Sequence, residues 1–477
     1  MTTKLAVIGG GPGGYVAAVS AAQMGADVTL VEQDRVGGTC LNRGCIPSKI
    51  MKTTAEMMEH FHRAAEFGIS ITGKPVVDMQ QLLARQQKVV SDQVKGIRNL
   101  LDHRNVRLLK GTGYIKGPKR IVVRQVDGTS LEVPYDRLIL ATGSEPLNIP
   151  AFPFDGRRII SSNDALTLDH VPESIMIVGG GVIGCEFAFI LSALGSRVTV
   201  VEALPRLLPL PSVDSDCSKV LQREMKKRKI NFMVNRTVER VDENAGKLRV
   251  DIGPSLVAEN LKDKDKAAVS ADVDMVLACI GRTPNTAGIG LGKLGVRTDD
   301  RGWIMADSRM ETGAPGVFAI GDALGPEKVM LAHVAYAEAR VAAGNATGRS
   351  RTMNYETVPS AIFTMPEVAD VGLTEIQANG QGYPVRADSV FFRSMGKAQV
   401  MGEIAGQAKI VSNAETGKIL GVHMIGPHAS DLIAEATLAV RTGCRVKDLA
   451  ETIHAHPTLS EIMPEVAFKA MDEPLHG

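Results

Sequence analysis

The stretch that decides the fold is Leu5-Ala-Val-Ile-Gly-Gly-Gly-Pro-Gly-Gly14, close to the start of the chain. Its apolar run predicts a buried strand, its glycines predict a tight turn, and the alanine-rich segment Tyr15–Met24 predicts a helix. Asp27–Val31 then predicts a second strand, which is followed by Glu32. This order is typical of a β-α-β unit that binds a dinucleotide.

The same order recurs about 170 residues further along the chain. Ser174–Val178 predicts a strand, the next glycines a turn, Cys185–Leu194 a helix, and Arg197–Val201 a strand that ends before Glu202. The repetition predicts two related nucleotide-binding modules rather than an array of short repeats.

Both turns match the Gly-x-Gly-x-x-Gly fingerprint. The first glycine makes the turn, the second lets a pyrophosphate approach the backbone, and the third allows close packing of helix on strand. The pattern alone is weak, and Gly290-x-Gly292-x-x-Gly295 also matches it, but that segment follows a turn and precedes no helix, so it is rejected. The candidate glycines are therefore Gly9, Gly11, Gly14, Gly179, Gly181 and Gly184.

An acidic residue ends the second strand of each module. Glu32 and Glu202 each accept hydrogen bonds from ribose hydroxyls in this interpretation. A 2′-phosphate beside Glu202 would meet repulsion on the order of 4 kcal/mol per charge pair, which favours NAD over NADP. Arg206 stands four residues further on and leaves that choice open.

Two cysteines follow the first module, in Gly37-Gly-Thr-Cys-Leu-Asn-Arg-Gly-Cys-Ile-Pro-Ser-Lys49. Four residues between Cys40 and Cys45 at a helix start allow a disulfide, and the helix N-terminus with a nearby lysine should depress a thiol pKa. A structural disulfide is disfavoured in a reducing compartment, and a metal pair lacks further ligands. The pattern therefore predicts that Cys40 and Cys45 form a redox-active pair and not a metal site. The other cysteines are expected to be packing residues: Cys185, Cys217, Cys279 and Cys444.

A histidine near the end of the chain is the candidate base for thiol exchange. His456 precedes a proline, and a carboxylate at Glu461 would orient its imidazole and stabilise the cation. A histidine in this position is equally often a plain surface residue, and His454 is interpreted as structural.

Composition excludes several classes of protein. The chain has 54 Lys+Arg against 53 Asp+Glu and 44% apolar residues, so nothing draws it to nucleic acid or to a membrane. It has neither a signal peptide nor about 18 consecutive apolar residues, so the expected location is cytoplasmic. Met51–Leu101, with mixed charge and few breakers, predicts helical structure, and the strand-rich segment from about Tyr355 onward predicts a separate α+β domain.

The chain resembles the pyridine-nucleotide disulfide oxidoreductases nearly from end to end, and within them the dihydrolipoyl dehydrogenase branch. Besides both fingerprints and the dithiol segment, the resemblance covers these motifs in the family's order: Ala141-Thr-Gly-Ser144, Gly281-Arg-Thr-Pro-Asn285, Ala319-Ile-Gly-Asp322, Met330-Leu-Ala-His333, Val358-Pro-Ser360 and His454-Ala-His-Pro-Thr-Leu-Ser-Glu461. It implies an α/β fold with two Rossmann-like dinucleotide-binding domains and a C-terminal α+β dimerisation domain. The expected ranges are 1–150 for FAD, completed by 281–350, then 151–280 for NAD, and 351–477 for the subunit interface.

The resemblance also implies roles for single residues. Cys45 would be the thiol on the flavin side, and Cys40 the outer thiol that exchanges with substrate. Lys49, paired with Glu186, would lie beside the flavin ring, and His456 would reach the dithiol of the other subunit of a homodimer. The remaining implied cofactor contacts are Gly113, Thr142, Gly143, Ser144, Gly281, Asp322, Ala332 and His333.

The implied reaction is oxidation of dihydrolipoyl groups through the disulfide and FAD, with reduction of NAD⁺. The partner would be a lipoyl-bearing acyltransferase or a glycine-cleavage carrier protein. Two alternatives stay open: a related NAD(P)H-dependent disulfide reductase, and a non-catalytic FAD/NAD-binding subunit. One departure from the family is Met365, where many members of the branch have histidine, and it bears on the interface domain.

Overall fold

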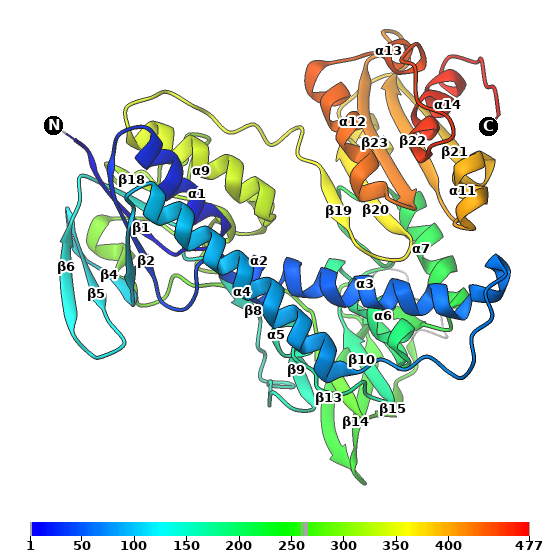
Figure 1. Ribbon diagram of the computed structural model, residues 1–477, viewed down its shortest axis with the longest axis horizontal. Coiled ribbons are helices and arrows are strands. Elements are labelled where there is room, and N and C mark those ends of the chain that lie inside the picture. The colour runs from blue at the N-terminus through cyan, green and yellow to red at the C-terminus, as the bar shows by residue number, and fades with distance from the viewer. Residues whose placement is uncertain (1, 259–260, 262–265, 477) are drawn as a thin grey trace. The chain divides into compact units, whose positions relative to one another are not determined.

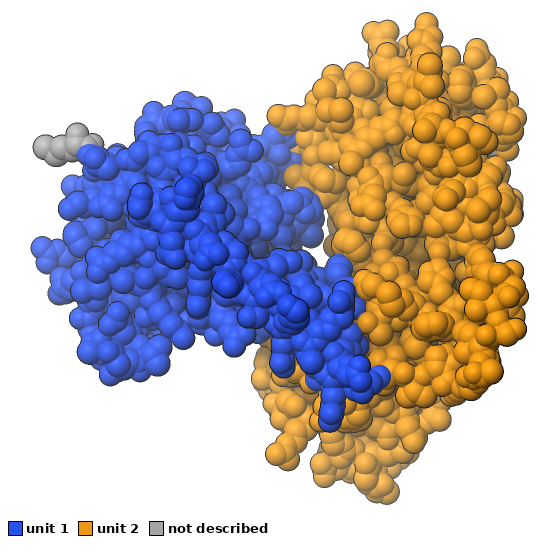
Figure 2. All heavy atoms as spheres, in the orientation of Figure 1, with its two compact units in different colours: residues 1–50, 78–147, 281–355 blue, residues 51–77, 148–280, 356–477 orange. Residues whose placement is uncertain are grey.

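The computed structural model describes residues 2–258, 261 and 266–476, and its chain divides into two compact units. Unit 1 comprises residues 1–50, 78–147 and 281–355, and unit 2 comprises residues 51–77, 148–280 and 356–477 (Figure 2). Each unit is therefore assembled from segments that lie far apart in the sequence.

Unit 1 is built on a parallel sheet of five strands in the order β18-β7-β1-β2-β3 (Figure 1). These strands are Val317–Ala319, Arg137–Leu140, Lys4–Ile8, Asp27–Glu32 and Arg107–Lys110. Helices α1 (Pro12–Gln23) and α9 (Ala332–Ala346) pack against each other, and α4 (Met79–His103) also contacts α1. The strand order, with β1 central, places the glycine turn after β1 at the carboxyl edge, where α/β sheets bind ligands.

The rest of unit 1 consists of small sheets and short helices. An antiparallel sheet contains β4 (Thr112–Gly117), β5 (Arg120–Arg124) and β6 (Ser130–Pro134), and β8 (Ser144–Pro146) pairs with β17 (Arg282–Pro284). The short helices are α2 (Gly38–Arg43), η2 (Leu291–Leu294), η3 (Gly321–Leu324) and η4 (Pro326–Lys328).

Unit 2 contains the second parallel sheet, in the order β12-β11-β10-β16-β9. Its strands are Asn231–Val234, Arg197–Glu202, Ser174–Val178, Met275–Ala278 and Ile159–Ser161. An antiparallel sheet of β13 (Arg236–Asn244), β14 (Lys247–Pro254) and β15 (Val269–Val273) shares its core, and the helices are α5 (Ser162–Ala165), α6 (Val182–Leu194) and α7 (Ser215–Lys227).

The C-terminal part of unit 2 is an antiparallel sheet in the order β19-β20-β23-β22-β21, with helices packed on it. The strands are Ser360–Ile362, Glu367–Gly372, Ile419–Gly426, Gln407–Asn413 and Val385–Phe391. The helices are α10 (Glu375–Gly380), α11 (Gly396–Met401), α12 (Ala429–Thr442), α13 (Val446–Ala450) and α14 (Ile462–Lys469), with short η5 (Phe392–Ser394) and η6 (Leu459–Glu461). The 51–77 segment of unit 2 contributes the short η1 (Ala64–Phe67). The prediction of an α/β fold with two Rossmann-like modules and a C-terminal α+β domain is confirmed.

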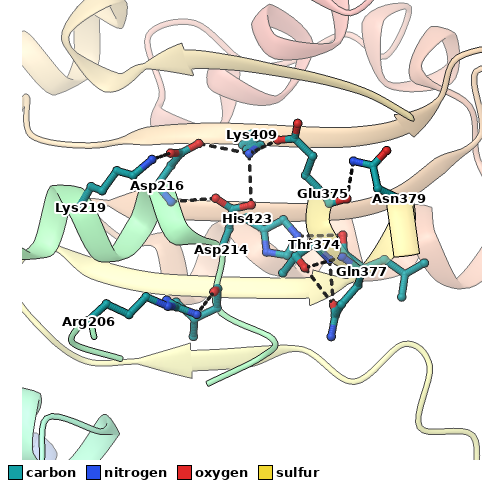
Figure 3. Close-up of polar contacts among 12 residues, drawn as sticks. Arg206, Asp214, Asp216, Lys219, Thr374, Glu375, Gln377, Asn379, Lys409 and His423 are labelled. Atoms are coloured by element: carbon teal, nitrogen blue, oxygen red, sulfur yellow. Dashed lines mark hydrogen bonds and ion pairs between the residues drawn. The ribbon is translucent and has the colours of Figure 1, made fainter. Parts of the chain in front are cut away.

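A buried lysine joins the second module to this sheet (Figure 3). Lys409 Nζ on β22 lies 3.2 Å from Asp214 Oδ2, 3.1 Å from Asp216 Oδ2 and 2.7 Å from Glu375 Oε2. Asp214 also caps α7 through the N–H of Asp216. A buried cation is tolerated only with such partners, so the contact fixes the C-terminal sheet on the start of α7.

The prediction of helix over residues 51–101 is confirmed at both ends of the range and wrong in the middle. The structure has α3 (Cys45–His62), the short η1, and then a segment without regular structure before α4 begins at Met79. Gly68 and Gly73 in that break have φ of +73° and +87°, which ends a right-handed helix. Asp78 accepts a hydrogen bond from the N–H of Gln81 and so caps the start of α4.

Candidate functional site

The first fingerprint turn joins β1 to α1. Gly9 has φ +102°, which favours glycine, and a Cβ on Gly14 would overlap the carbonyl oxygen of Gly9. Gly11 differs, because its φ is −67° and an added Cβ would meet its nearest atom, Gly38 Cα, only at 3.8 Å. The protein itself therefore does not require glycine at position 11, and the space left there fits a ligand that approaches the backbone.

The second fingerprint repeats this geometry in unit 2. Gly179 has φ +104°, and a Cβ on Gly184 would overlap the carbonyl oxygen of Gly179. Gly181 has φ −75°, and no atom lies within 4 Å of the place where its Cβ would be. Both turns thus keep an open space at the middle glycine, as a bound pyrophosphate requires.

Alanine substitution of the middle glycines should separate the two nucleotide sites. Gly181→Ala is expected to weaken NAD⁺ binding about 10-fold or more, since the methyl group would overlap the pyrophosphate, and to leave FAD binding unchanged. Gly11→Ala should do the reverse. Titration calorimetry with each nucleotide measures both affinities; equal affinity of Gly181→Ala and wild type for NAD⁺ would refute this use of the turn.

The predicted ribose acids lie beside these turns. Glu32 accepts hydrogen bonds from the N–H groups of Gly10 at 2.7 Å and Asp34 at 2.7 Å. Glu202 accepts them from Gly180 at 2.6 Å and Leu204 at 2.8 Å. Burial, partly offset by the N–H of Gly10 and the charge of Arg43, raises the pKa of Glu32. These bonds hold both carboxylates against the turns, where carboxylate lone pairs remain available for ribose hydroxyls.

Arg206 turns toward its own loop. Its guanidinium donates hydrogen bonds of 2.9 Å to the carbonyl oxygens of both Leu210 and Val213. This engagement explains why a basic residue four positions after Glu202 need not act as a phosphate ligand.

The two cysteines of the dithiol segment lie side by side in unit 1. Cys40 is in α2, Cys45 is the first residue of α3, and both are thiols in this structure. A hydrogen bond to Cys45, together with burial and the charge of Cys45, raises the pKa of the Cys40 thiol far above its usual range, while Lys49 lowers it. The expected depression of the pKa is therefore wrong for Cys40 in the reduced pair, because the adjacent sulfur outweighs the lysine.

Several cofactor contacts implied by the resemblance gather in unit 1 around Asp322. Asp322 Oδ2 accepts a hydrogen bond of 2.8 Å from the hydroxyl of Ser144, on β8. Thr142 Oγ1 is buried and has no hydrogen-bond partner among the described residues, as expected for a group that bonds to a ligand. Ala332 and His333 begin α9, while Gly113 lies on β4, where a Cβ would press on Ile8.

Sequence reasoning missed Arg282, which follows the implied contact Gly281. Its guanidinium is largely buried and donates to the hydroxyl oxygen of Ser144 at 2.6 Å and the carbonyl oxygen of Ser144 at 2.7 Å. Its Nε lies 3.7 Å from Asp322 Oδ2. The motif Gly281-Arg-Thr-Pro-Asn285 contained this residue, but only the fold brings it to Ser144.

In unit 2, His456 and Glu461 form the predicted pair. His456 Nδ1 lies 2.8 Å from Glu461 Oε1, and Glu461 Oε2 accepts a hydrogen bond of 2.8 Å from the N–H of Thr458. The imidazole is 77% exposed, so its other nitrogen is open to a reacting group. Burial raises the pKa of Glu461, but the N–H of Thr458 and His456 together hold it below its usual value.

His454 differs from its neighbour, as predicted. Its Nε2 lies 2.9 Å from Glu435 Oε1, its Nδ1 lies 2.8 Å from the carbonyl oxygen of Thr452, and its side chain is 8% exposed. Both ring nitrogens are thus occupied. Glu186 on α6 is buried and accepts a hydrogen bond from the N–H of Phe363. Lys49 belongs to unit 1 and Glu186 to unit 2, so their pairing stays a prediction.

Neither a metal site nor a membrane-spanning helix is found among the described residues. They contain no group of three His, Cys, Asp or Glu side chains that could hold a metal ion. None of their helices combines the length and apolar character needed to cross a lipid bilayer.

Comparison with known proteins matches both parts of the chain. Residues 3–339 match the family model of pyridine nucleotide-disulphide oxidoreductases, and residues 358–467 match the dimerisation domain of that family. The chain is 42% identical to dihydrolipoyl dehydrogenase of Chlamydia muridarum over 98% of this chain and 97% of the relative. It is 38% identical to that of Bacillus subtilis over 99% and 100%. The crystal structure of LpdA from Mycobacterium tuberculosis superposes with a TM-score of 0.88 at 28% identity, covering 98% and 99% of the two chains.

Proposed function

The chain belongs to the pyridine nucleotide-disulphide oxidoreductases, and on that premise we propose how it oxidises dihydrolipoyl groups with NAD⁺. It is a flavoprotein oxidoreductase whose cofactors are FAD and NAD. The observation that supports the proposed chemistry most directly is the pair of adjacent thiols, Cys40 and Cys45, which immediately follows the first nucleotide-binding module.

Electrons and protons balance over two half-reactions. In the first, the two thiols of a dihydrolipoyl group reduce the Cys40–Cys45 disulfide by exchange, which yields a lipoyl disulfide and two enzyme thiols. In the second, the enzyme thiols return to the disulfide, and NAD⁺ gains two electrons and one proton while the other proton reaches solvent. Bound FAD supplies the chemistry that carries the electron pair from sulfur to the nicotinamide.

We assign roles to the residues as follows. Cys40 exchanges with substrate and Cys45 faces the flavin, as the family resemblance implies, and the hydrogen bond between the two sulfurs keeps them within reach of each other. His456 takes the proton of the attacking thiol and returns it, oriented by Glu461. By the same resemblance, Lys49 would act beside the flavin, with Glu186 as its predicted partner.

The matched dimerisation domain supports a homodimer. We propose that His456 of one subunit serves the dithiol of the other. The partner is a protein that carries the lipoyl group, either an acyltransferase or a glycine-cleavage carrier, and the reaction takes place in the cytoplasm. Residues 1–150 with 281–350 would bind FAD, 151–280 NAD, and 351–477 would form the interface.

The decisive experiment mixes the purified protein with dihydrolipoamide and either NAD⁺ or NADP⁺ and follows NADH or NADPH absorbance. We expect turnover with NAD⁺ and a kcat/KM at least about 10²-fold lower with NADP⁺, because Glu202 repels the 2′-phosphate and Arg206 is engaged in its loop. Glutathione disulfide with each reduced nicotinamide tests the related reductases. Bound flavin without any turnover would favour the non-catalytic subunit.

A further inference from the structure

Glu338 is a buried acid that has no part in the roles above. It lies on α9, two turns after Ala332, and is 1% exposed. Burial raises the pKa of its carboxyl to about 7, although Tyr355 and the N–H of Gly321 act in the opposite direction. A buried carboxyl persists only where its oxygens have partners, so its contacts indicate what it is for.

Both oxygens of Glu338 have a short hydrogen bond. Oε2 accepts from the N–H of Gly321 at 2.6 Å, and Oε1 accepts from the hydroxyl of Tyr355 at 2.6 Å. Gly321 has φ +66° and is the first residue of η3. The carboxyl therefore ties α9 to the first peptide of the turn that carries Asp322.

The other side of the same turn is held by Ser144 and Arg282. Asp322 accepts from the Ser144 hydroxyl at 2.8 Å, and that hydroxyl oxygen accepts from Arg282 Nε at 2.6 Å. Asp322 is thus fixed through its side chain by Ser144, and the residue before it, Gly321, is fixed through its N–H by Glu338. Because these contacts already fix the side chain, little conformational entropy is lost when Asp322 binds its ligand.

We propose that Glu338 is a positioning residue of the flavin site: by accepting the Gly321 N–H it sets the turn on which Asp322 meets FAD. This rests on the proposed function, in which Asp322 is a flavin contact. Glu338 acts through the turn and need not touch the flavin itself.

The test is the dissociation constant for FAD, measured on the apoprotein by the change in flavin fluorescence. Glu338→Leu keeps the volume but removes both acceptors, so FAD should bind about 10-fold or more weakly. Glu338→Gln keeps a carbonyl oxygen for Gly321, and since the neutral acid is already accessible near pH 7, it should restore the affinity to within about 3-fold of wild type. Leucine and glutamine variants of equal weakness would overturn the proposal.

If the Glu338→Leu protein does not fold, a second variant still tests the proposal. Tyr355→Phe removes only the hydroxyl that holds Oε1, and FAD should bind about 2- to 10-fold more weakly. If Glu338→Leu and Tyr355→Phe, or whichever of the two folds, bind FAD as tightly as wild type, the proposal is overturned.

The matched control is Asp370→Asn on β20, because burial also raises the pKa of the Asp370 carboxyl to about 7. Asp370 belongs to the C-terminal sheet of unit 2, and its change should leave FAD affinity as it is. In every variant, NAD⁺ affinity and the apoprotein melting temperature report general damage, and FAD weakening that merely follows such damage contradicts a positioning role. A wild-type protein that binds no FAD would refute the proposed function before any variant is compared.

Discussion

Cys45→Ser should lower NADH formation from dihydrolipoamide and NAD⁺ by at least about 10⁴-fold, because a hydroxyl cannot form the disulfide that accepts the substrate's electrons. Cys40→Ser should lose as much, since the exchange needs both sulfurs of the pair. The measurement is NADH absorbance under saturating substrates.

Two controls show that a loss belongs to the dithiol. NADH-driven reduction of ferricyanide needs both cofactors and no thiol, so it should survive in the Cys45→Ser protein. Cys444→Ser changes a partly exposed cysteine that contacts the hydroxyl of Thr442, and it should leave both activities intact. Wild-type turnover of dihydrolipoamide by Cys45→Ser would remove the dithiol from the reaction altogether.

His456→Ala should lower kcat for dihydrolipoamide by about 10²- to 10⁴-fold, the range for loss of a general acid–base group. Glu461→Gln should reduce kcat in the same direction but less, because it leaves the imidazole in place and removes only the charged partner 2.8 Å from Nδ1. The pH profile of kcat should change in both variants, and ferricyanide reduction should not.

The chain offers a matched control in a second histidine–carboxylate pair. His476 Nδ1 lies 2.7 Å from Glu465 Oε1, and that imidazole is 71% exposed, much like His456. His476→Ala should therefore keep full activity. A kcat for His456→Ala equal to that of His476→Ala would show that the predicted base is an ordinary surface residue.

Mixed dimers test whether the histidine serves the other subunit. Cys45→Ser and His456→Ala should each lose at least about 10²-fold in activity alone, but a dimer of the two restores one site with an intact dithiol and an intact histidine. Random pairing of equal amounts should therefore recover about one quarter of wild-type activity, since half of the dimers carry one good site out of two. No recovery in verified mixed dimers would place His456 with its own subunit's thiols.

Local patterns in the sequence determined much of this protein. Each fingerprint lies within one strand–turn–helix segment, Cys40 and Cys45 are separated by four residues, and Glu461 follows His456 after one short turn. Such relationships depend on the nearest few residues, whose backbone preferences and side-chain reach can be read directly. The two parallel modules, the adjacent thiols and the histidine–carboxylate contact were predicted for that reason.

Other features were decided only by the tertiary structure. The raised pKa of Cys40 is one of them, because it follows from the hydrogen bond of the folded pair. The break between α3 and α4, by contrast, lies at Gly68 and Gly73, which the sequence itself contains. Ser144 meets Asp322 across 178 residues of sequence, and Glu338 meets Gly321 across 17. No local periodicity encodes such contacts, because they depend on how the strands of unit 1 are ordered and on where α9 packs against α1. The position of the two thiols could therefore be predicted from neighbouring residues. The contacts that hold Asp322 form only when distant segments pack in one core.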